Sequence, residues 1–454
     1  MNKTKEKIMT SRRFLVLGAG KSGLAVAKLL KQQNKIVIVN DQKEIKELPD
    51  TVRQLEQLEI PFIFGEHPLS LLSSTDVVIV SPGISPNINI IKTAMVKGYP
   101  IIGELEYASY FINKPIIAIT GTNGKTTVTT WIYYTLRELG INTALGGNND
   151  TPLSDIVLLA KSYDWIVAEV SSYQLEYCYD FHPQIAGVLN VTPDHISRHS
   201  TLKEYADVKS KIFKNQQRED IAIINEDDDW VRQMKIPTDV SQYRFSLEMK
   251  VPTGAWIENE NIHFNETYLG HIQQIPLKGK HNLANALAVL CALCPIIESP
   301  EKVFKAMCSF KGVPHRIEFI AQKDGVEFYN DSKSTNVESL KVALESFNQP
   351  IILIAGGQGK GASYQPLRPL IQEKVCFLIT LGEDAHNIEE AFSDLVKTTR
   401  VNSMEEAVQT AWENAFPNAV VLLSPACASF DMYPNYEFRG EHFRKCVQQL
   451  LRKE

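Results

Sequence analysis

Short apolar runs rich in β-branched residues alternate with segments of helical periodicity along almost the whole chain. Runs of this kind span residues 14–17, 36–40 and 77–80, then 116–120, 165–170, 185–190 and 221–224, and finally 326–329, 351–355, 377–380 and 420–423. This alternation is typical of parallel sheets wrapped by helices. We therefore predict the α/β class, with three domains that each contain a mainly parallel sheet flanked by helices.

The chain length supports this division, since 454 residues correspond to about three domains of ordinary size. A new strand begins after Lys114 and Pro115, and residues 311–314 contain a glycine and a proline that suit a hinge. We predict domains at residues 1–112, 113–312 and 313–454.

The composition narrows the class of partners. A formal net charge of −6 gives no overall positive field for nucleic acid, and the apolar run after the polar segment 1–13 is far too short for a membrane span. Seven cysteines without a secretory signal indicate reduced thiols. Cys291 and Cys294 lie in an apolar helical run with no second ligand pair, so we interpret them as packed core thiols. We expect a cytoplasmic monomer with neither nucleic-acid nor membrane partners.

A glycine-bracketed turn follows the predicted strand 116–120. Gly121 and Gly124 allow backbone N–H groups to close around phosphate oxygens, Lys125 adds a positive charge, and the Thr126 hydroxyl can bind Mg²⁺ at a helix N-terminus. The motif departs from the standard phosphate loop in having Ile119 where the first glycine belongs. A turn that only connects strand to helix is the alternative. The predicted phosphate-binding residues are Gly121, Thr122, Asn123, Gly124, Lys125, Thr126 and Thr127.

A second glycine turn, Gly18 to Gly23, follows the first predicted strand, and Asp41 ends the next one. This spacing is typical of a Rossmann-like dinucleotide site, in which the acid binds a ribose. The same turn could hold another diphosphate-linked nucleoside, or serve only helix packing. Because the chain also has the phosphate loop, we favour a nucleotide-linked substrate together with a nucleoside triphosphate. We expect Rossmann-like N- and C-terminal domains around a P-loop-like central domain.

Three residues near the phosphate loop are candidate metal ligands. Glu169 ends a predicted strand, so its carboxylate should emerge beside the loop. His195 follows the next strand and is either a ligand or a structural loop histidine. Lys209 falls within the apolar stripe of the predicted helix 203–215, whereas Lys211 and Lys214 point elsewhere. In one interpretation, the apolar stem of Lys209 is buried and its amine reaches solvent. In the other, the amine is buried as well, so its pKa falls and the neutral amine can capture CO₂ as a carbamate.

Further polar residues gather at predicted strand and helix ends. Asn282 and Asn285 are one helical turn apart and could read an adenine edge together, although helix capping is equally compatible with their spacing. In the last third of the chain, the segments 315–316, 331–336, 356–361 and 424–429 carry cations and hydroxyls. Together these groups could form one side of a cleft for carboxylates and phosphates.

These motifs together resemble the Mur ligase family, and the resemblance runs nearly from end to end. It rests on residues 120–127, 169–175, 190–195, 281–286, 315–316, 331–336 and 424–429. The first glycine turn and the segment 429–436 are most similar to the family member that adds D-glutamate. The resemblance implies ATP-dependent amide ligation in peptidoglycan precursor synthesis. The alanine carboxylate of UDP-N-acetylmuramoyl-L-alanine would be phosphorylated, and the amine of D-glutamate would displace the phosphate.

The resemblance also implies a role for each candidate residue. The implied catalytic residues are Lys125, Glu169, His195, Lys209, Lys333 and Lys360. ATP would contact the phosphate loop, Asn282, Asn285, Arg316 and Asp331, while two Mg²⁺ ions would be held by Thr126, Glu169, His195 and a carbamylated Lys209. The UDP end would rest on Lys21, Ser22, Asp41, Gln42, Gly83 and Asn148, and D-glutamate on Thr335, Lys360, Ser429 and Tyr436.

Two positions depart from the family pattern. Ser197 stands where such ligases often have aspartate, and residues 147–150 replace the usual glycine-asparagine-isoleucine-glycine run. The resemblance further implies closure of the third domain onto ATP, with residues 312–314 as the hinge. The rival interpretations are a related ligase for another amino acid or folate, an NAD-dependent oxidoreductase built on the first glycine turn, and a nucleotide-gated binding module.

Overall fold

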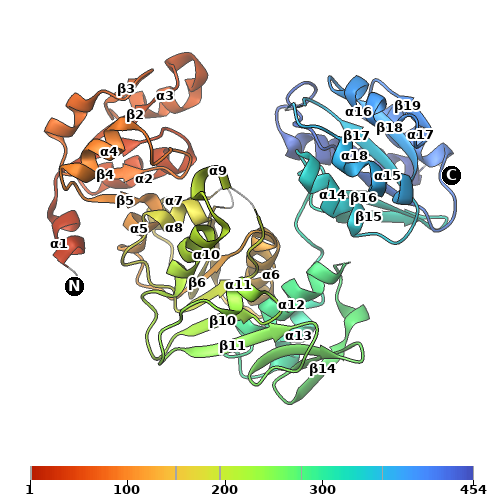
Figure 1. Cartoon of the computed structure of the whole chain (residues 1–454), viewed down its shortest axis with the longest axis horizontal. Helices are drawn as coiled ribbons and strands as arrows, with labels where there is room; N and C mark the ends of the chain where they lie inside the picture. Colours follow the sequence, from red (N-terminus) through yellow and green to blue (C-terminus); the bar gives the residue numbers. More distant parts are fainter. Residues whose placement is uncertain (1–2, 149–150, 194–195, 278, 360, 453–454) are drawn as a thin grey trace. The chain divides into compact units, whose positions relative to one another are not determined.

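A computed structural model describes residues 3–148, 151–193, 196–277, 279–359 and 361–452. The described chain contains three sheets (Figure 1). The N-terminal sheet is fully parallel in the order β3-β2-β1-β4-β5. Its strands are β1 Arg13–Leu17, β2 Ile36–Asp41, β3 Phe62–Phe64, β4 Val77–Val80 and β5 Ile101–Gly103.

The central sheet has the order β14-β13-β12-β11-β10-β9-β6-β8-β7. It is parallel from β7 to β12, and only β13 and β14 run antiparallel to their neighbours. Its strands are β6 Ile116–Thr120, β7 Thr143–Gly147, β8 Trp165–Glu169, β9 Ile185–Val188, β10 Ile221–Asn225, β11 Ser241–Ser246, β12 Gly254–Glu258, β13 Asn261–Phe264 and β14 Thr267–His271.

The C-terminal sheet has the order β15-β16-β20-β17-β18-β19, and only its edge strand β15 is antiparallel. Its strands are β15 Glu318–Lys323, β16 Val326–Asn330, β17 Ile351–Gly356, β18 Val375–Leu381, β19 Thr398–Arg400 and β20 Val420–Leu423. The inner strands β17 and β20 are buried at every position, as expected for parallel strands covered on both faces.

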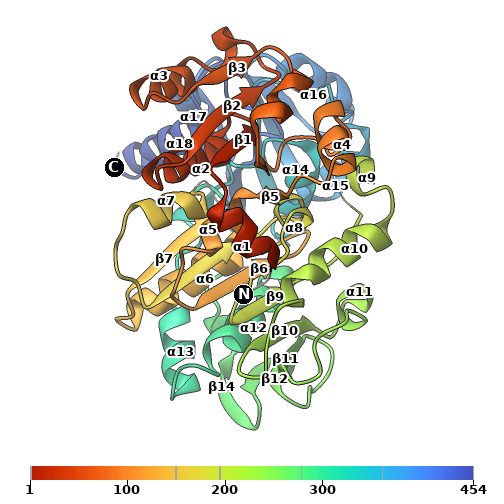
Figure 2. The same cartoon turned by 90° about the vertical axis from the view of Figure 1, so that its left-hand side faces the viewer.

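Helices flank all three sheets, and α6, for example, packs along β6, β7 and β8 (Figure 2). The N-terminal part of the chain has α1 Lys3–Thr10, α2 Lys21–Gln32, α3 Pro49–Gln57, α4 Asn89–Val96 and α5 Glu104–Ser109. The central part has α6 Lys125–Glu138, α7 Leu153–Leu158, α8 Ser172–Glu176, α9 Ile196–His199, α10 Leu202–Ser210, α11 Asp229–Arg232, α12 Lys280–Leu293 and α13 Pro300–Met307. The C-terminal part has α14 Val337–Glu345, α15 Arg368–Lys374, α16 Ala385–Phe392, α17 Met404–Glu413 and α18 Tyr436–Arg452. Short 3-10 turns are η1 Ile45–Glu47, η2 Leu69–Ser74, η3 Lys211–Phe213, η4 Ile272–Gln274 and η5 Gln365–Leu367.

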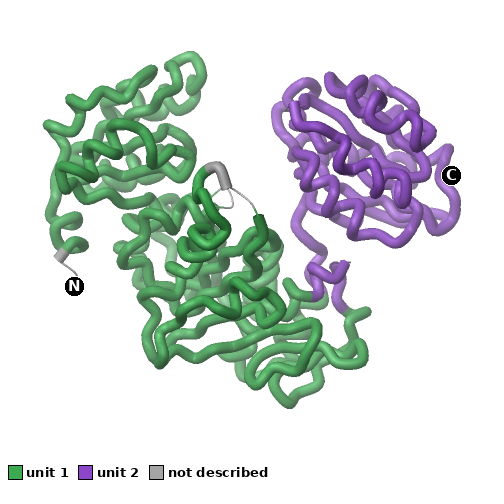
Figure 3. The backbone as a smooth tube through the Cα atoms, viewed as in Figure 1, with its two compact units in different colours: residues 1–274, 284–308 green, residues 275–283, 309–454 purple. Residues whose placement is uncertain are grey.

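The described chain divides into two compact units (Figure 3). The first unit contains residues 1–274 and 284–308, and with them the N-terminal and central sheets; the second contains residues 275–283 and 309–454, and with them the C-terminal sheet. The fold thus has the predicted α/β class and three mainly parallel sheets. Within the described ranges, every helix is too short or too polar to cross a membrane.

The eleven strands predicted from apolar runs are all present, with shifts of at most two residues at their ends. The predicted helix 203–215 is wrong in extent, because α10 stops at Ser210 and the chain tightens into η3. The side-chain amide of Asn215 lies beyond both and donates to the carbonyl oxygens of Tyr179 and Phe181 at 2.8 and 3.0 Å. These bonds tie the end of the segment to residues 179–181.

Two buried glutamates of α5 join the N-terminal and central parts of the first unit. Glu106 accepts hydrogen bonds from the backbone N–H groups of residues 179–181 and from the hydroxyl of Tyr110. Glu104 accepts one from the N–H of Ser154 at 2.7 Å, while its Oε2 has no partner among the described residues. Burial raises the pKa of Glu104 from 4.5 to about 7. The two carboxylates therefore differ in how well their charge is compensated.

We predict that Glu104→Gln stabilises the protein at pH 8 but not at pH 5. The folded-state pKa of Glu104 lies above its unfolded value, so the native state holds the extra proton and wild-type stability falls as pH rises from 4.5 to about 7. The neutral amide removes up to about 3 kcal/mol of this loss at pH 8. Urea denaturation at both pH values measures the difference.

Glu106→Gln is the matched control. Its amide nitrogen would face backbone N–H donors, so we expect a loss of about 1–3 kcal/mol at both pH values. A stability difference between Glu104→Gln and wild type that does not grow with pH would contradict the assignment of a costly buried charge to Glu104.

Candidate functional site

The predicted phosphate loop lies between the carboxyl ends of β8 and β9, because β6 pairs with both strands in parallel. Gly124 has φ +86 and precedes α6, whose first turn receives no side-chain cap. The backbone N–H groups of the first turn of α6 therefore carry the partial positive charge of a helix N-terminus. The left-handed φ favours glycine at position 124. The geometry suits an anion bound by backbone N–H groups.

The loop is tied to the segment after β9 by a set of short hydrogen bonds. Asn123 N donates to Asn190 Oδ1 at 2.8 Å, and Asn190 Nδ2 returns a bond to Asn123 O at 3.1 Å. The Thr122 hydroxyl accepts from Thr192 N at 3.0 Å, and Thr122 N donates to Asn190 O at 3.0 Å. The two segments thus hold each other in position. Asn190 and Thr192 belong to a motif noted in the sequence but were not assigned a role.

Two lysine side chains meet at the carbonyl oxygen of Gly121. Lys125 Nζ donates to it at 3.0 Å and to the Thr122 carbonyl at 2.8 Å, while Lys209 Nζ donates to it at 2.8 Å. The Lys209 side chain is 1 % exposed, and its Nζ lies 4.3 Å from the ring centroid of Tyr205. The prediction of an inward-facing Lys209 is confirmed. Two amines therefore converge on the loop from different helices.

Glu169 ends β8 beside the loop, as predicted, and is 3 % exposed. Its Oε1 accepts from Asn148 Nδ2 at 2.9 Å, whereas Oε2 is buried without a hydrogen-bond partner among the described residues. A buried carboxylate oxygen without a donor is costly unless a cation or donor meets it. Asn148 was predicted for the UDP end, but here its amide orients the carboxylate. Asn149 and Asp150 lie outside the described residues.

His195 also lies outside the described residues, and the nearby Arg198 was missed by sequence analysis. Arg198 donates three bonds to Glu176, at 2.9, 3.2 and 2.6 Å, and stacks over Tyr173. Its third nitrogen donates to the carbonyl of Pro82 at 3.1 Å. Arg198 thereby links the turn next to Gly83 to the central part of the first unit.

The N-terminal glycine turn lies where the strand order reverses between β1 and β4. Gly23 packs so tightly that a Cβ there would lie 1.8 Å from the Gly18 carbonyl oxygen, and Ser81 Oγ donates to that oxygen at 3.0 Å. Asp41 accepts from Ala19 N at 2.7 Å and from Lys43 N at 2.9 Å, so its carboxylate closes the turn. The predicted residues Lys21, Ser22, Gln42 and Gly83 are exposed or half-buried along this sheet edge.

In α12, Asn285 reaches the phosphate loop and Asn282 is also buried. The Oδ1 atom of Asn285 lies only 2.5 Å from where a Cβ on Gly124 would stand. This close approach, together with the positive φ, requires glycine at position 124. Cys291 lies further along α12 and Cys294 directly follows the helix; both are buried, which agrees with packed core thiols.

In the second unit, the loops after β16, β17 and β20 meet at one sheet edge. Asp331 is buried, accepts from Ser424 Oγ at 2.8 Å, and has a pKa raised to about 7 by burial. Lys333 Nζ lies 5.4 Å from the ring centroid of Tyr436. The other predicted residues described there are the exposed Arg316, the half-buried Thr335 and the buried Ser429. Lys360 lies outside the described residues.

Arg439 of α18 holds these loops together and was not predicted. Its Nε and one terminal nitrogen donate to the Oγ and carbonyl of Ser332 at 3.0 and 2.9 Å. The terminal nitrogens also donate to the carbonyls of Cys427 and Ala428 at 3.0 and 3.2 Å. Burial lowers the pKa of Arg439 to about 10. One guanidinium thus fixes two of the loops that carry predicted site residues.

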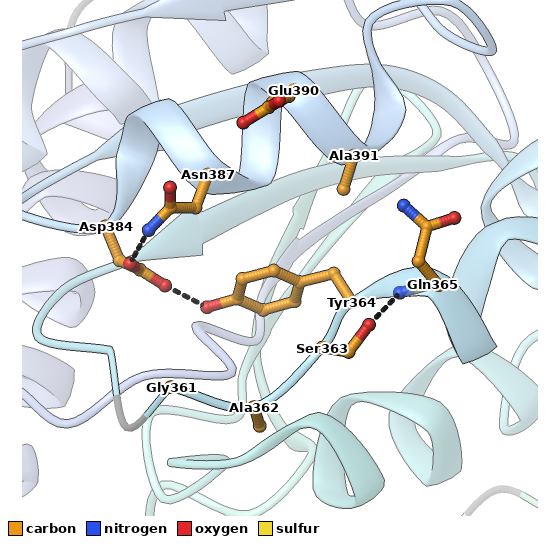
Figure 4. A pocket seen from close by; sticks show the side chains of 9 residues that line it. All are labelled: Gly361, Ala362, Ser363, Tyr364, Gln365, Asp384, Asn387, Glu390 and Ala391. Atoms are coloured by element: carbon orange, nitrogen blue, oxygen red, sulfur yellow. Dashed lines mark hydrogen bonds between the residues drawn. The ribbon is translucent and has the colours of Figure 1, made fainter.

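A pocket of about 380 Å³ adjoins the loop after β17 (Figure 4). The Tyr364 ring lies across it, with the hydroxyl bonded to Asp384 and 3.1 Å from Cys427 Sγ. Asn387 donates to the same carboxylate at 2.6 Å, and Asp384 N donates to the Gly357 carbonyl at 2.8 Å. Asp384 therefore connects the glycine-rich loop to the segment that contains Cys427.

Family profiles match three consecutive parts of the chain. They are the Mur ligase MurD-like N-terminal domain at residues 12–103, the Mur ligase middle domain at 119–293, and the Mur ligase glutamate ligase domain at 315–427. Among solved structures, UDP-N-acetylmuramate-alanine ligase MurC from Thermotoga maritima has the same fold, with a TM-score of 0.58 at 18% identity over 97% of this chain and 99% of that one.

Curated relatives are similar along almost their whole length. The UDP-N-acetylmuramoylalanine–D-glutamate ligase of Geobacter sp. strain M21 is 38% identical over 446 residues, covering 97% of this chain and 98% of the relative. The ligase of the same name from Thermoanaerobacter pseudethanolicus is 37% identical over 455 residues, covering 98% and 100%. The chain therefore belongs to the Mur ligase family.

Proposed function

We propose that the chain is an ATP-dependent ligase that adds D-glutamate to UDP-N-acetylmuramoyl-L-alanine in the cytoplasmic synthesis of peptidoglycan precursors. The observation that carries this proposal is that Lys125 and Lys209 both bond to the Gly121 carbonyl of the phosphate loop, while the buried Glu169 ends the strand that pairs with β6, which leads into this loop. The full-length similarity to D-glutamate ligases supports the choice of substrates. The protein is expected to act as a monomer with domains at residues 1–112, 113–312 and 313–454.

The reaction has two balanced steps. A carboxylate oxygen of the alanine attacks the γ-phosphorus of ATP, and ADP leaves. The ammonium group of D-glutamate first loses one proton to solvent. The resulting amine attacks the acyl carbon, the carbon–oxygen bond to phosphate breaks, and the second proton passes to the departing phosphate as the amide forms. Both steps bring anions together, so the chain must position them and offset their charge.

The phosphate loop and Lys125 would position ATP. The N–H groups at the start of α6 would bind phosphate oxygens, and Lys125 would leave its loop carbonyls to contact the β- and γ-phosphates. Asn282 and Asn285 would meet the adenine, while Arg316, Asp331 and Lys333 would contact nucleotide from the third domain. Residues 312–314 would serve as the hinge for this closure.

Two Mg²⁺ ions would be held by donor groups of the first unit. Glu169 offers a buried oxygen without a donor and Thr126 a hydroxyl at the start of α6, both hard oxygen ligands. His195 and a carbamylated Lys209 would complete the second ion's ligands. When bound, Mg²⁺ would offset negative charge on the phosphates.

Lys209 is suited to carbamate formation by its burial against the loop. The resulting anion would replace a cation beside Gly121, which would change the local charge by two units while the side chain stays in place.

The remaining substrate groups would bind at two sheet edges. The UDP end would rest on Lys21, Ser22, Asp41, Gln42 and Gly83, near the strand-order reversal of the first sheet. Asn148 would act on Glu169 and the substrate together. Thr335, Lys360, Ser429 and Tyr436 would receive D-glutamate.

The substrate assignment is tested by phosphate release. We expect inorganic phosphate from ATP only when UDP-N-acetylmuramoyl-L-alanine and D-glutamate are both present. L-glutamate, L-lysine, meso-diaminopimelate and a folate substrate serve as controls in the same assay. Unchanged ATP in the complete mixture, or turnover that prefers another acceptor, would refute the assignment.

We predict that Lys209→Met lowers the ligation rate at least about 100-fold, because the hydrophobic stem remains but the nitrogen is lost. Added short carboxylates should restore part of the activity by replacing the carbamate. Lys214→Met, at an exposed position of the same segment, is the control and should retain the wild-type rate. Full activity in Lys209→Met would exclude a catalytic role.

We predict that Arg439→Lys raises the KM for D-glutamate at least about 10-fold, because a single ammonium cannot keep the forked contacts to both loops. Arg452→Lys, at the exposed end of the same helix, should leave the KM unchanged. Steady-state kinetics at saturating ATP measure the effect, and an unaltered KM in Arg439→Lys would show that the loops do not depend on this guanidinium.

A further inference from the structure

A cluster of three potential metal-binding side chains lies in the second unit, apart from the residues assigned to ligation. Glu405 of α17 and His442 and Cys446 of α18 each offer one donor atom, and these atoms all lie within 4.8 Å of one another. A search of the described residues for groups of at least three histidine, cysteine or acidic side chains with donor atoms this close together finds this group. A tetrahedral metal ion lies about 2.0–2.3 Å from each of its ligand atoms. Small adjustments of the three side chains would bring their donor atoms to the spacing that such an ion needs.

The cluster has one buried member on a helix and two members that solvent can reach. His442 and Cys446 are four residues apart on α18, so they lie on the same face one turn apart. Cys446 is 6 % exposed and belongs to the core beneath the two helices. The side chains of His442 and Glu405 are 34% and 58% exposed. A metal could enter from solvent and keep a water molecule on the open side.

The imidazole ring of His442 is oriented by contacts at both of its nitrogens. Nδ1 is 2.8 Å from the hydroxyl of Tyr433, and Nε2 is 2.9 Å from Glu405 Oε1. A metal-bound histidine needs a hydrogen-bond partner on its other nitrogen, and Tyr433 can supply it. With Nδ1–H donating to Tyr433, the lone pair of Nε2 would be available to a metal ion on the side of Glu405.

We propose that Glu405, His442 and Cys446 form a binding site for a thiophilic divalent metal ion, such as Zn²⁺. Carboxylate, imidazole and thiolate are ligands that this ion accepts, with water in the fourth position. Coordination replaces the thiol proton of Cys446, which passes to solvent. The ion would link α17 to α18 and, through Tyr433, to the segment 429–436. The ordinary alternative is a surface ion pair beside a packed thiol.

The test uses Co²⁺ as a spectroscopic probe of the full-length, chelator-treated protein. We expect one equivalent of Co²⁺ to produce a near-ultraviolet thiolate-to-metal charge-transfer band, and Zn²⁺ to abolish it by competition. Oxygen-only sites that also take Co²⁺ give no such band. Its absence from the wild-type protein at millimolar Co²⁺ would overturn the proposal without any variant.

Variants assign the band to the three residues. Cys446→Ser and His442→Ala should lose it, and Glu405→Gln, an exposed change that leaves the core intact, should require at least tenfold more Co²⁺ for the same signal. Cys376→Ser removes an exposed cysteine on β18 and should leave the band unchanged. A band that survives Cys446→Ser, or that disappears in Cys376→Ser, would place the metal elsewhere and refute the site.

Discussion

Two lysine amines share one backbone carbonyl at the phosphate loop, and the proposed chemistry depends on this arrangement. Lys125 and Lys209 reach Gly121 O from separate helices, at 3.0 and 2.8 Å, and Lys209 does so while almost fully buried. Both amines bring positive charge to the same side of the loop, and positive charge at this place favours a bound anion. The loop is therefore arranged for anions before any substrate arrives, and Glu169 adds a carboxylate that a cation can satisfy.

The strand order makes this arrangement possible. Because β6 lies between β8 and β9, the phosphate loop, Glu169 and the segment after β9 emerge at one edge of the central sheet. The parallel neighbours β16, β20 and β17 do the same for the loops of the second unit. Sequence analysis could predict both groupings, since apolar runs fix the strands and polar motifs directly follow them. It also predicted the inward face of Lys209 from helical periodicity.

Other features could not be read from the sequence, because they depend on contacts between distant segments. Arg439 and Arg198 look like ordinary helix-surface cations, yet the first is buried among loop carbonyls and the second connects Pro82 with Glu176. Asn148 was assigned through its motif alone, and only the fold brings it to Glu169. The short edge strands, such as β3 and β19, have too few residues to show a pattern. Helix α10 ends at Ser210 and passes into a 3-10 turn, a change that the apolar periodicity of the segment does not reveal.

In the proposed reaction, the substrate carboxylate is activated by transfer of phosphate to one of its oxygens. This transfer can be followed with UDP-N-acetylmuramoyl-L-alanine labelled with the heavy oxygen isotope in the alanine carboxylate. Each inorganic phosphate released during ligation should contain one oxygen atom from that carboxylate. Phosphate that carries no label, while the amide product forms at the normal rate, would rule out an acyl-phosphate intermediate.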